Sequence, residues 1–157
     1  MKKIFSDLKN IIFGLMFLIL IGTVFYLMIG QLKRQENYVI INKNLKITVE
    51  LAQNDLERYQ GLSNRKSLCQ NCGMLFSWPD PEVQYFVMRD MKFPLDIIFI
   101  ADQKIVKIEN NLWPEDDPTI NYSSDVPVNY ALEVNGGLTE RYGVSVGDEV
   151  IINIQKK

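Results

Sequence analysis

A long apolar stretch without charges, near the amino end, is the feature that most constrains this chain. Residues 11–30 are almost all apolar, and no Asp, Glu, Lys or Arg occurs between Lys9 and Lys33. A helix rises about 1.5 Å per residue, so roughly 20 such residues cross a hydrocarbon core of about 30 Å. The sequence therefore predicts a transmembrane signal anchor over residues 11–30, flanked by residues 1–10 and followed by a polar tether at 31–37.

Two other interpretations of this stretch stay open, a cleaved signal peptide and a buried core helix. The apolar region of a signal peptide is usually about 7–15 residues long and is followed by small residues at the cut. This run is longer and ends in Val24-Phe25-Tyr26-Leu27-Met28-Ile29. The basic residues on the two flanks nearly balance and slightly favour a cytoplasmic amino terminus. We therefore expect a single-pass cell-membrane protein whose remaining chain is extracytoplasmic.

The remaining residues, 38–157, have the length of one domain with a real core. The net charge of −2 argues against a nucleic-acid partner, because phosphate contacts demand a basic surface. The sequence contains no histidine, which excludes Ser-His-Asp and Cys-His catalysis and histidine metal sites within this chain. We predict no cofactor and no metal, and we lean towards a protein that is not an enzyme.

Short apolar runs separated by turn residues indicate many short strands. Leu45, Ile47 and Val49 alternate with polar residues, the period of two expected of a strand with one buried face. This spacing favours an all-β sandwich or barrel with one or two short helices. The expected hairpins are 38–41 with 45–51, 73–78 with 83–88, and 95–101 with 104–109; a capping box predicts a short helix after Asn54, and a helical turn is expected at 138–142.

Two cysteines, Cys69 and Cys72, form a C-x-x-C pair. In an oxidising exterior they should join in a local disulfide. A structural zinc site would need four ligands, and the chain offers two cysteines and no histidine. A redox-active pair is the other alternative, although the sequence predicts no βαβ unit of the kind that carries such a motif in thioredoxins.

Charged residues gather around a connection between two expected strands, and two interpretations of them stay open, an ion-paired turn and a polar cleft. Glu133 has an apolar neighbour on each side, so it becomes a buried carboxylate if both faces of its strand are covered, and Arg89 is then its natural partner. An ion-paired turn is the alternative to a cleft that holds a small polar or anionic ligand. The candidate ligand-binding residues are Arg89, Asp90, Asp96, Glu133 and Asn135; no catalytic residue is predicted.

Several blocks of residues together resemble the DUF192 (UPF0127) family of small prokaryotic domains, whose biochemical role is uncharacterised. The resemblance implies a compact jelly-roll-like β-sandwich and implies no reaction. The sequence departs from the family pattern at two positions, with Val87 where the motif often has Trp and Asp90 where it often has Asn. The blocks are Val49-Glu50-Leu51-Ala52, Gly61-Leu62 with Arg65 and Leu68, Gly73-Met74-Leu75-Phe76, Phe86-Val87-Met88-Arg89-Asp90-Met91, Pro94-Leu95-Asp96-Ile97, Tyr130-Ala131-Leu132-Glu133-Val134-Asn135 with Gly137, and Gly143 with Val146-Gly147-Asp148.

The sequence thus predicts a non-enzymatic, membrane-anchored module of the cell envelope that binds a ligand or partner. The membrane is contacted through residues 11–30, and the partner is a small polar ligand, a glycan or an envelope protein. Trp113, Tyr122 and Tyr85 add aromatic side chains of the kind that sugar and protein contact surfaces use. The alternative is a thiol-dependent redox or other enzymatic role that uses Cys69 and Cys72 or the charged cluster.

Overall fold

The computed structural model describes residues 2–31, 36–114 and 120–155, and within the first helix it describes the side chains of residues 12–26. The chain divides into two compact units, and the boundary between them in the sequence follows Gln35. The first unit is helix α1 (Lys2–Gln31). In the part of the chain that the structure describes, no helix is long and apolar enough to cross a membrane. The expected tether lies largely outside the described residues.

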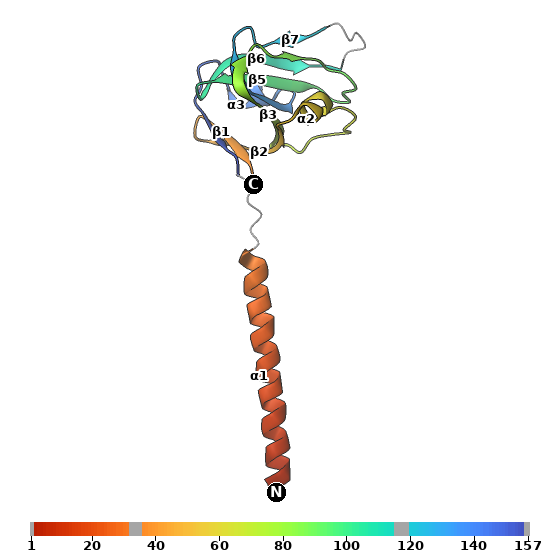
Figure 1. Ribbon diagram of the computed structural model, residues 1–157, viewed down its shortest axis with the longest axis vertical. Helices are drawn as coiled ribbons and strands as arrows, with labels where there is room; N and C mark the ends of the chain where they lie inside the picture. Colours follow the sequence, from red (N-terminus) through yellow and green to blue (C-terminus); the bar gives the residue numbers. More distant parts are fainter. Residues whose placement is uncertain (1, 32–35, 115–119, 156–157) are drawn as a thin grey trace. The chain divides into compact units, whose positions relative to one another are not determined.

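The second unit consists of short strands and two short helices (Figure 1). Seven strands form one sheet in the order β6-β5-β8-β3-β2-β1-β9, and β4 and β7 form a small second sheet. The elements are β1 (Tyr38–Ile41), β2 (Leu45–Ala52), α2 (Asp55–Gln60), β3 (Cys72–Glu82), β4 (Tyr85–Phe86), β5 (Leu95–Ala101), β6 (Lys104–Leu112), β7 (Tyr122–Ser123), β8 (Val128–Asn135), α3 (Leu138–Tyr142) and β9 (Val150–Asn153).

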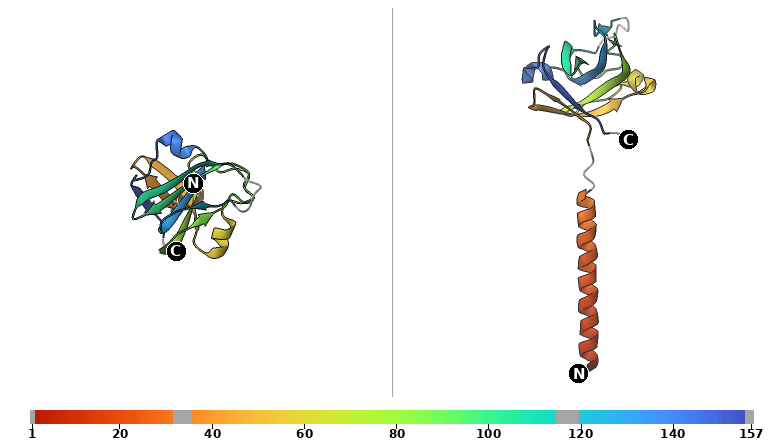
Figure 2. Two further views of the ribbon diagram at one scale, coloured as in Figure 1. Left: turned by 90° about the horizontal axis from the view of Figure 1, so that it is seen from above. Right: turned by 60° about the vertical axis from the view of Figure 1, so that its left-hand side comes forward.

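The large sheet curls, so that its first and last strands approach each other (Figure 2). An antiparallel bridge joins Lys104 at the start of β6 to Glu149, just before β9. Gly147 also donates a backbone hydrogen bond of 2.8 Å to the Ile105 carbonyl. The expected mostly-β class with short helices is confirmed. The arrangement is one curled, half-barrel sheet instead of the two facing sheets of a sandwich.

The pairing of β3 differs from the sequence prediction. The expected hairpin between residues 73–78 and 83–88 is wrong, because β3 runs on through Pro79 and Pro81 and pairs with β8, while β4 pairs with β7. Proline cannot donate to a ladder, and the register of β3 against β8 shifts after Ser77. On its other side β3 lies parallel to β2, with α2 in the connection. The prediction of no βαβ unit is therefore also wrong.

Both faces of the sheet are buried, each by its own apolar cluster. One cluster includes Ile47, Leu75 and Leu132, and the other includes Phe76, Phe99 and Ala131. Gly73 allows β3 and β8 to lie close, because a Cβ there would stand 2.7 Å from the backbone oxygen of Glu133. Since both faces are covered, every side chain in the middle of β8 is removed from water.

Candidate functional site

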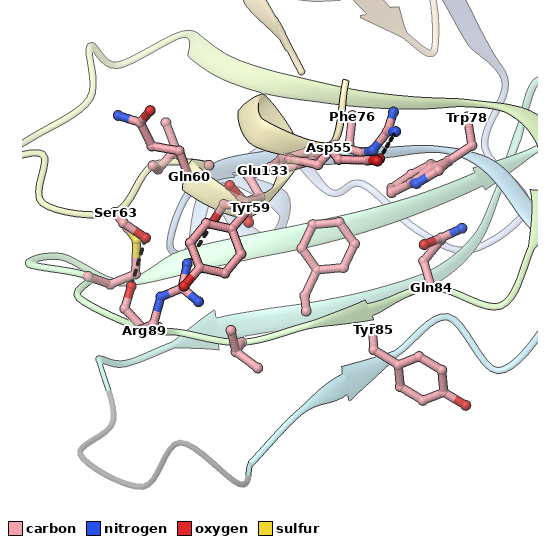
Figure 3. Close-up of a pocket in the computed structure, with 16 residues that line it drawn as sticks. Asp55, Tyr59, Gln60, Ser63, Phe76, Trp78, Gln84, Tyr85, Arg89 and Glu133 are labelled. Atoms are coloured by element: carbon pink, nitrogen blue, oxygen red, sulfur yellow. Dashed lines mark hydrogen bonds and ion pairs between the residues drawn. The ribbon is translucent and has the colours of Figure 1, made fainter. Parts of the chain in front are cut away.

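A cavity of about 300 Å³ opens between α2 and the chain segment that includes β4 (Figure 3). Its apolar surface comes from aromatic rings in mutual contact, because Phe86 meets both Phe76 and Trp78 edge to face at 5.0 Å and 6.2 Å between ring centroids. Tyr59 and Tyr85 are exposed at its edge. The cavity is at the small end of the range typical of ligand pockets.

The ends of helix α2, which forms one wall of the cavity, are set by residues within and next to the helix. The backbone amide of Glu57 donates to the Asn54 side chain at 2.9 Å, and the backbone amide of Asn54 donates to the Glu57 carboxylate at 3.3 Å. These two reciprocal bonds form a capping box. Gly61 ends the helix with φ of +49°, a conformation that favours glycine. The predicted capping box and helix end are confirmed.

Two cations on the cavity wall are held by neighbouring groups. Arg58 donates to the Ser77 carbonyl at 2.8 Å and forms an ion pair of 2.7 Å with Asp55. Arg89 donates to the Tyr59 carbonyl at 2.6 Å, and its guanidinium carbon lies 4.0 Å from the centre of the Tyr59 ring. The charge on each arginine is thereby partly balanced before any ligand arrives.

Glu133 from β8 forms the floor of the cavity. Its side-chain neighbours across the two adjacent strands are Met74 and Ile97, both buried and apolar. Glu133 itself is only 6% exposed, and no described donor lies within hydrogen-bond distance of its Oε2 atom. Burial raises its pKa to about 8, while attraction to Arg65 opposes the rise. The carboxyl group is therefore mostly protonated at neutral pH and can both donate and accept a hydrogen bond.

Of the five predicted ligand-binding residues, the structure brings Arg89 and Glu133 to the same cavity. Asp90 is next to the cavity but takes a positive φ of +56°, and its carboxylate stands 3.9 Å from Arg89. The Nδ2 atom of Asn135 donates to the Cys69 carbonyl at 2.8 Å and so supports the cysteine loop.

Asp96 lies on the opposite side of the sheet from Glu133 and is fully buried. Its Oδ1 atom accepts from the backbone amides of Asn111 and Gly137, at 2.7 Å and 2.8 Å. Its Oδ2 atom accepts from the amide of Thr139 at 2.8 Å and from the hydroxyl of Thr139 at 2.6 Å. Asp96 therefore joins β6, α3 and the turn between β8 and α3, and the cleft that would unite it with Arg89 and Glu133 does not form.

Cys69 and Cys72 are joined in a disulfide just before and at the start of β3. The segment between α2 and Cys69 is tied to β2 by Arg65, whose guanidinium is paired with Glu50. Among the described residues, no group of three or more Cys, Asp or Glu side chains is placed to hold a metal ion.

Sequence reasoning missed the aromatic and cationic walls. Tyr59 and Arg58 stand on a helix that was predicted, but nothing in the spacing of the chain shows that this helix faces Trp78 and Phe86. Two signals in the sequence pointed to parts of this cavity: the predicted helix after Asn54, and Glu133, an acid flanked by apolar residues on β8.

Comparison with known proteins identifies the family of the second unit. The model of a family described as DUF192, Uncharacterized ACR, matches residues 38–152. The chain belongs to the DUF192 family. No curated protein matches it.

Two solved structures resemble this DUF192 chain. One, from Sinorhizobium meliloti 1021, is described as a "putative transcription regulator"; it is 34% identical with a TM-score of 0.70, and the match covers 74% of this chain and 93% of that one. The other, a protein of unknown function from Novosphingobium aromaticivorans DSM 12444, is 33% identical with a TM-score of 0.68, covering 73% of this chain and 83% of that one.

The two departures from the DUF192 pattern now have different structural meanings. Val87 lines the cavity and is 40% exposed, so the position where the motif often carries Trp shapes the pocket. Asp90 occupies a left-handed backbone conformation, which Asn and Asp tolerate better than other side chains with a Cβ. The backbone therefore explains why either Asn or Asp stands at this position, without a ligand.

Proposed function

We propose that this chain is a non-enzymatic binding module that takes a small polar ligand into the cavity between α2 and β4, and that residues 11–30 anchor it to the cell membrane with the domain extracytoplasmic. The observation that carries the binding proposal is Glu133, a buried carboxyl group that faces the cavity with an oxygen unpartnered among the described residues. A buried polar atom without a hydrogen bond costs about 1–3 kcal/mol, and a ligand that supplies the bond recovers that cost.

The pairing of the other acidic side chain of the cavity, and of the two cysteines outside it, supports binding over catalysis. Asp55, the second acidic side chain on its wall, is paired with Arg58. The cysteine sulfurs are joined to each other in a disulfide. A ring-lined hollow with a few polar groups is the usual composition of a ligand pocket.

Ligand binding can be measured through Trp78, which lines the cavity, since the chain has only one other tryptophan, Trp113. The protein is the full chain in detergent, carrying the substitution Trp113→Phe. It is titrated with three probes, benzoate, ethanolamine and glucose. At least one probe should change the fluorescence of Trp78 saturably, and Glu133→Leu should weaken that probe at least tenfold. Glu149→Gln, an exposed acid outside the cavity, is the matched control and should leave binding unchanged. Absence of a saturable change with all three probes would contradict the proposal.

The support for the anchor is the uncharged run in the sequence, and the disulfide provides a second test of location. We expect the full chain to stay with membranes during alkaline extraction and Cys69 and Cys72 to resist alkylation in cells lysed in the presence of the reagent. Deletion of residues 1–35 should release the domain from the membrane. A chain recovered without membranes, with both thiols modified, would contradict the proposed location. Reduction of the folded domain by a mild dithiol, with unchanged stability, would favour the redox alternative.

A further inference from the structure

Each arginine of the cavity wall already has an acidic neighbour within the protein. Arg58 is paired with Asp55 at 2.7 Å, and Arg89 stacks on Tyr59 and lies 3.9 Å from Asp90. Burial of Glu133 favours its uncharged form at neutral pH. A charged ligand would therefore have to compete with these internal partners for an arginine or an acidic side chain, whereas an uncharged ligand would not.

The cavity alternates apolar rings with polar side chains. Trp78 and Phe86 supply flat apolar surfaces, while Gln60, Ser63 and Gln84 supply hydrogen-bonding groups on different parts of the wall. In Figure 3, Gln60 and Ser63 lie at one end of the hollow and Gln84 at the other, with Glu133 behind Tyr59. A matching occupant has apolar faces and polar groups around its edge.

We propose that the occupant is an uncharged hydroxylated ring, a single monosaccharide unit, with one hydroxyl bonded to the Glu133 carboxyl group. A sugar ring carries C–H groups on its faces, which pack on aromatic rings, and hydroxyls around its edge, which both donate and accept. The volume of about 300 Å³ suits one such ring. This inference rests on the proposed binding function and specifies the class of ligand.

The test uses three sugars that share a pyranose ring and differ in charge: N-acetylglucosamine, glucosamine at pH 6 and glucuronate. Affinity is read from Trp78 fluorescence of the full chain with Trp113→Phe, in a polyoxyethylene detergent, because maltoside detergents would themselves offer a sugar. We expect N-acetylglucosamine to bind at least tenfold more tightly than both charged sugars. Binding of benzoate or ethanolamine without any sugar would overturn the sugar assignment and leave the binding function standing; no binding by any probe would overturn both.

Variants at Glu133 separate a hydrogen bond to the ligand from a merely structural role. Glu133→Gln keeps one donor and one acceptor and should bind the neutral sugar within about tenfold of the unsubstituted protein, whereas Glu133→Leu should abolish binding. Circular dichroism checks that both variants are folded. If Glu133→Leu binds the neutral sugar as tightly as Glu133→Gln does, the carboxyl group does not contact the sugar and the assignment is overturned.

The dependence of affinity on pH gives an independent readout. The charged or titratable groups near Glu133 are Arg65, which attracts it, and Asp55, Arg58, Arg89 and the two tyrosines of the cavity edge. Affinity for the neutral sugar should be constant between pH 5 and 7 and fall above about pH 8, where the carboxyl loses its proton. Glu133→Gln should remove this fall. An affinity that rises with pH would show that the ionised carboxylate receives the ligand, and would overturn the assignment.

Discussion

Replacing Asp96 by alanine should lower the free energy of unfolding by about 4 kcal/mol or more. The substitution leaves three backbone amides without their acceptor next to the buried Asp96 position, while the Thr139 hydroxyl keeps a second acceptor, Asn110 Oδ1, at 2.8 Å. Each buried donor that loses its partner costs about 1–3 kcal/mol, and hydrogen bonds to a charged acceptor lie at the upper end. Urea denaturation followed by circular dichroism measures the change.

Two further variants define what the Asp96 result means. Thr139→Val removes only one of the four donors and should cost about 1–2 kcal/mol. Asp80→Ala, an exposed acid on β3, should change stability by less than about 0.5 kcal/mol. A loss at Asp96 no larger than that at Thr139 would show that the backbone amides find other partners, and the role of Asp96 as a structural centre would be refuted.

Stability should also fall as pH rises through the range in which Glu133 titrates. The folded protein holds this proton up to about pH 8, whereas an unfolded glutamate releases it near 4.5. Between those values unfolding releases a proton, so a higher pH favours the unfolded chain. The contribution is fully present below pH 4.5, is lost as pH rises to about 8, and then stays constant. The total is on the order of 5 kcal/mol, since the pKa rises from 4.5 to about 8 and one pKa unit corresponds to about 1.4 kcal/mol.

The matched variant Glu133→Gln isolates this contribution from all other titrating groups. Unfolding in urea at pH 5, 6, 7 and 8 should give a difference between the two proteins that shrinks steadily with rising pH and then reverses in favour of the glutamine variant. A difference that stays constant across the range would mean that Glu133 is ionised in the folded domain or has a partner there.

Local signals in the sequence predicted local structure well. The β1–β2 hairpin follows from alternating residues and from a turn in which Asn42 and Lys43 both take positive φ. The β5–β6 hairpin forms in the same way around Asp102 and Gln103. In each case the partners are neighbours in the chain, so the information lies within about ten residues.

Pairings between distant segments could not be read from the same signals. Nothing near β3 specifies that its partners are β2 on one side and β8 on the other, and the proline-rich turn after Trp78 imitates a hairpin. The buried acid was anticipated at Glu133, but Arg89 is bound to the Tyr59 carbonyl. The sequence predicts that Asp96 binds a ligand, because the sequence around Asp96 cannot show that three backbone amides from distant segments converge on its carboxylate.

The position of β1 has a consequence for the order in which the domain can fold. β1 opens the domain, yet it lies between β2 and β9, the last strand, and pairs with both. The sheet therefore cannot be completed until almost the whole chain is available, and such non-local pairing is typical of domains that fold in milliseconds to seconds. A chain leaving the ribosome or a membrane channel amino end first would remain incompletely folded until residues 150–153 emerge.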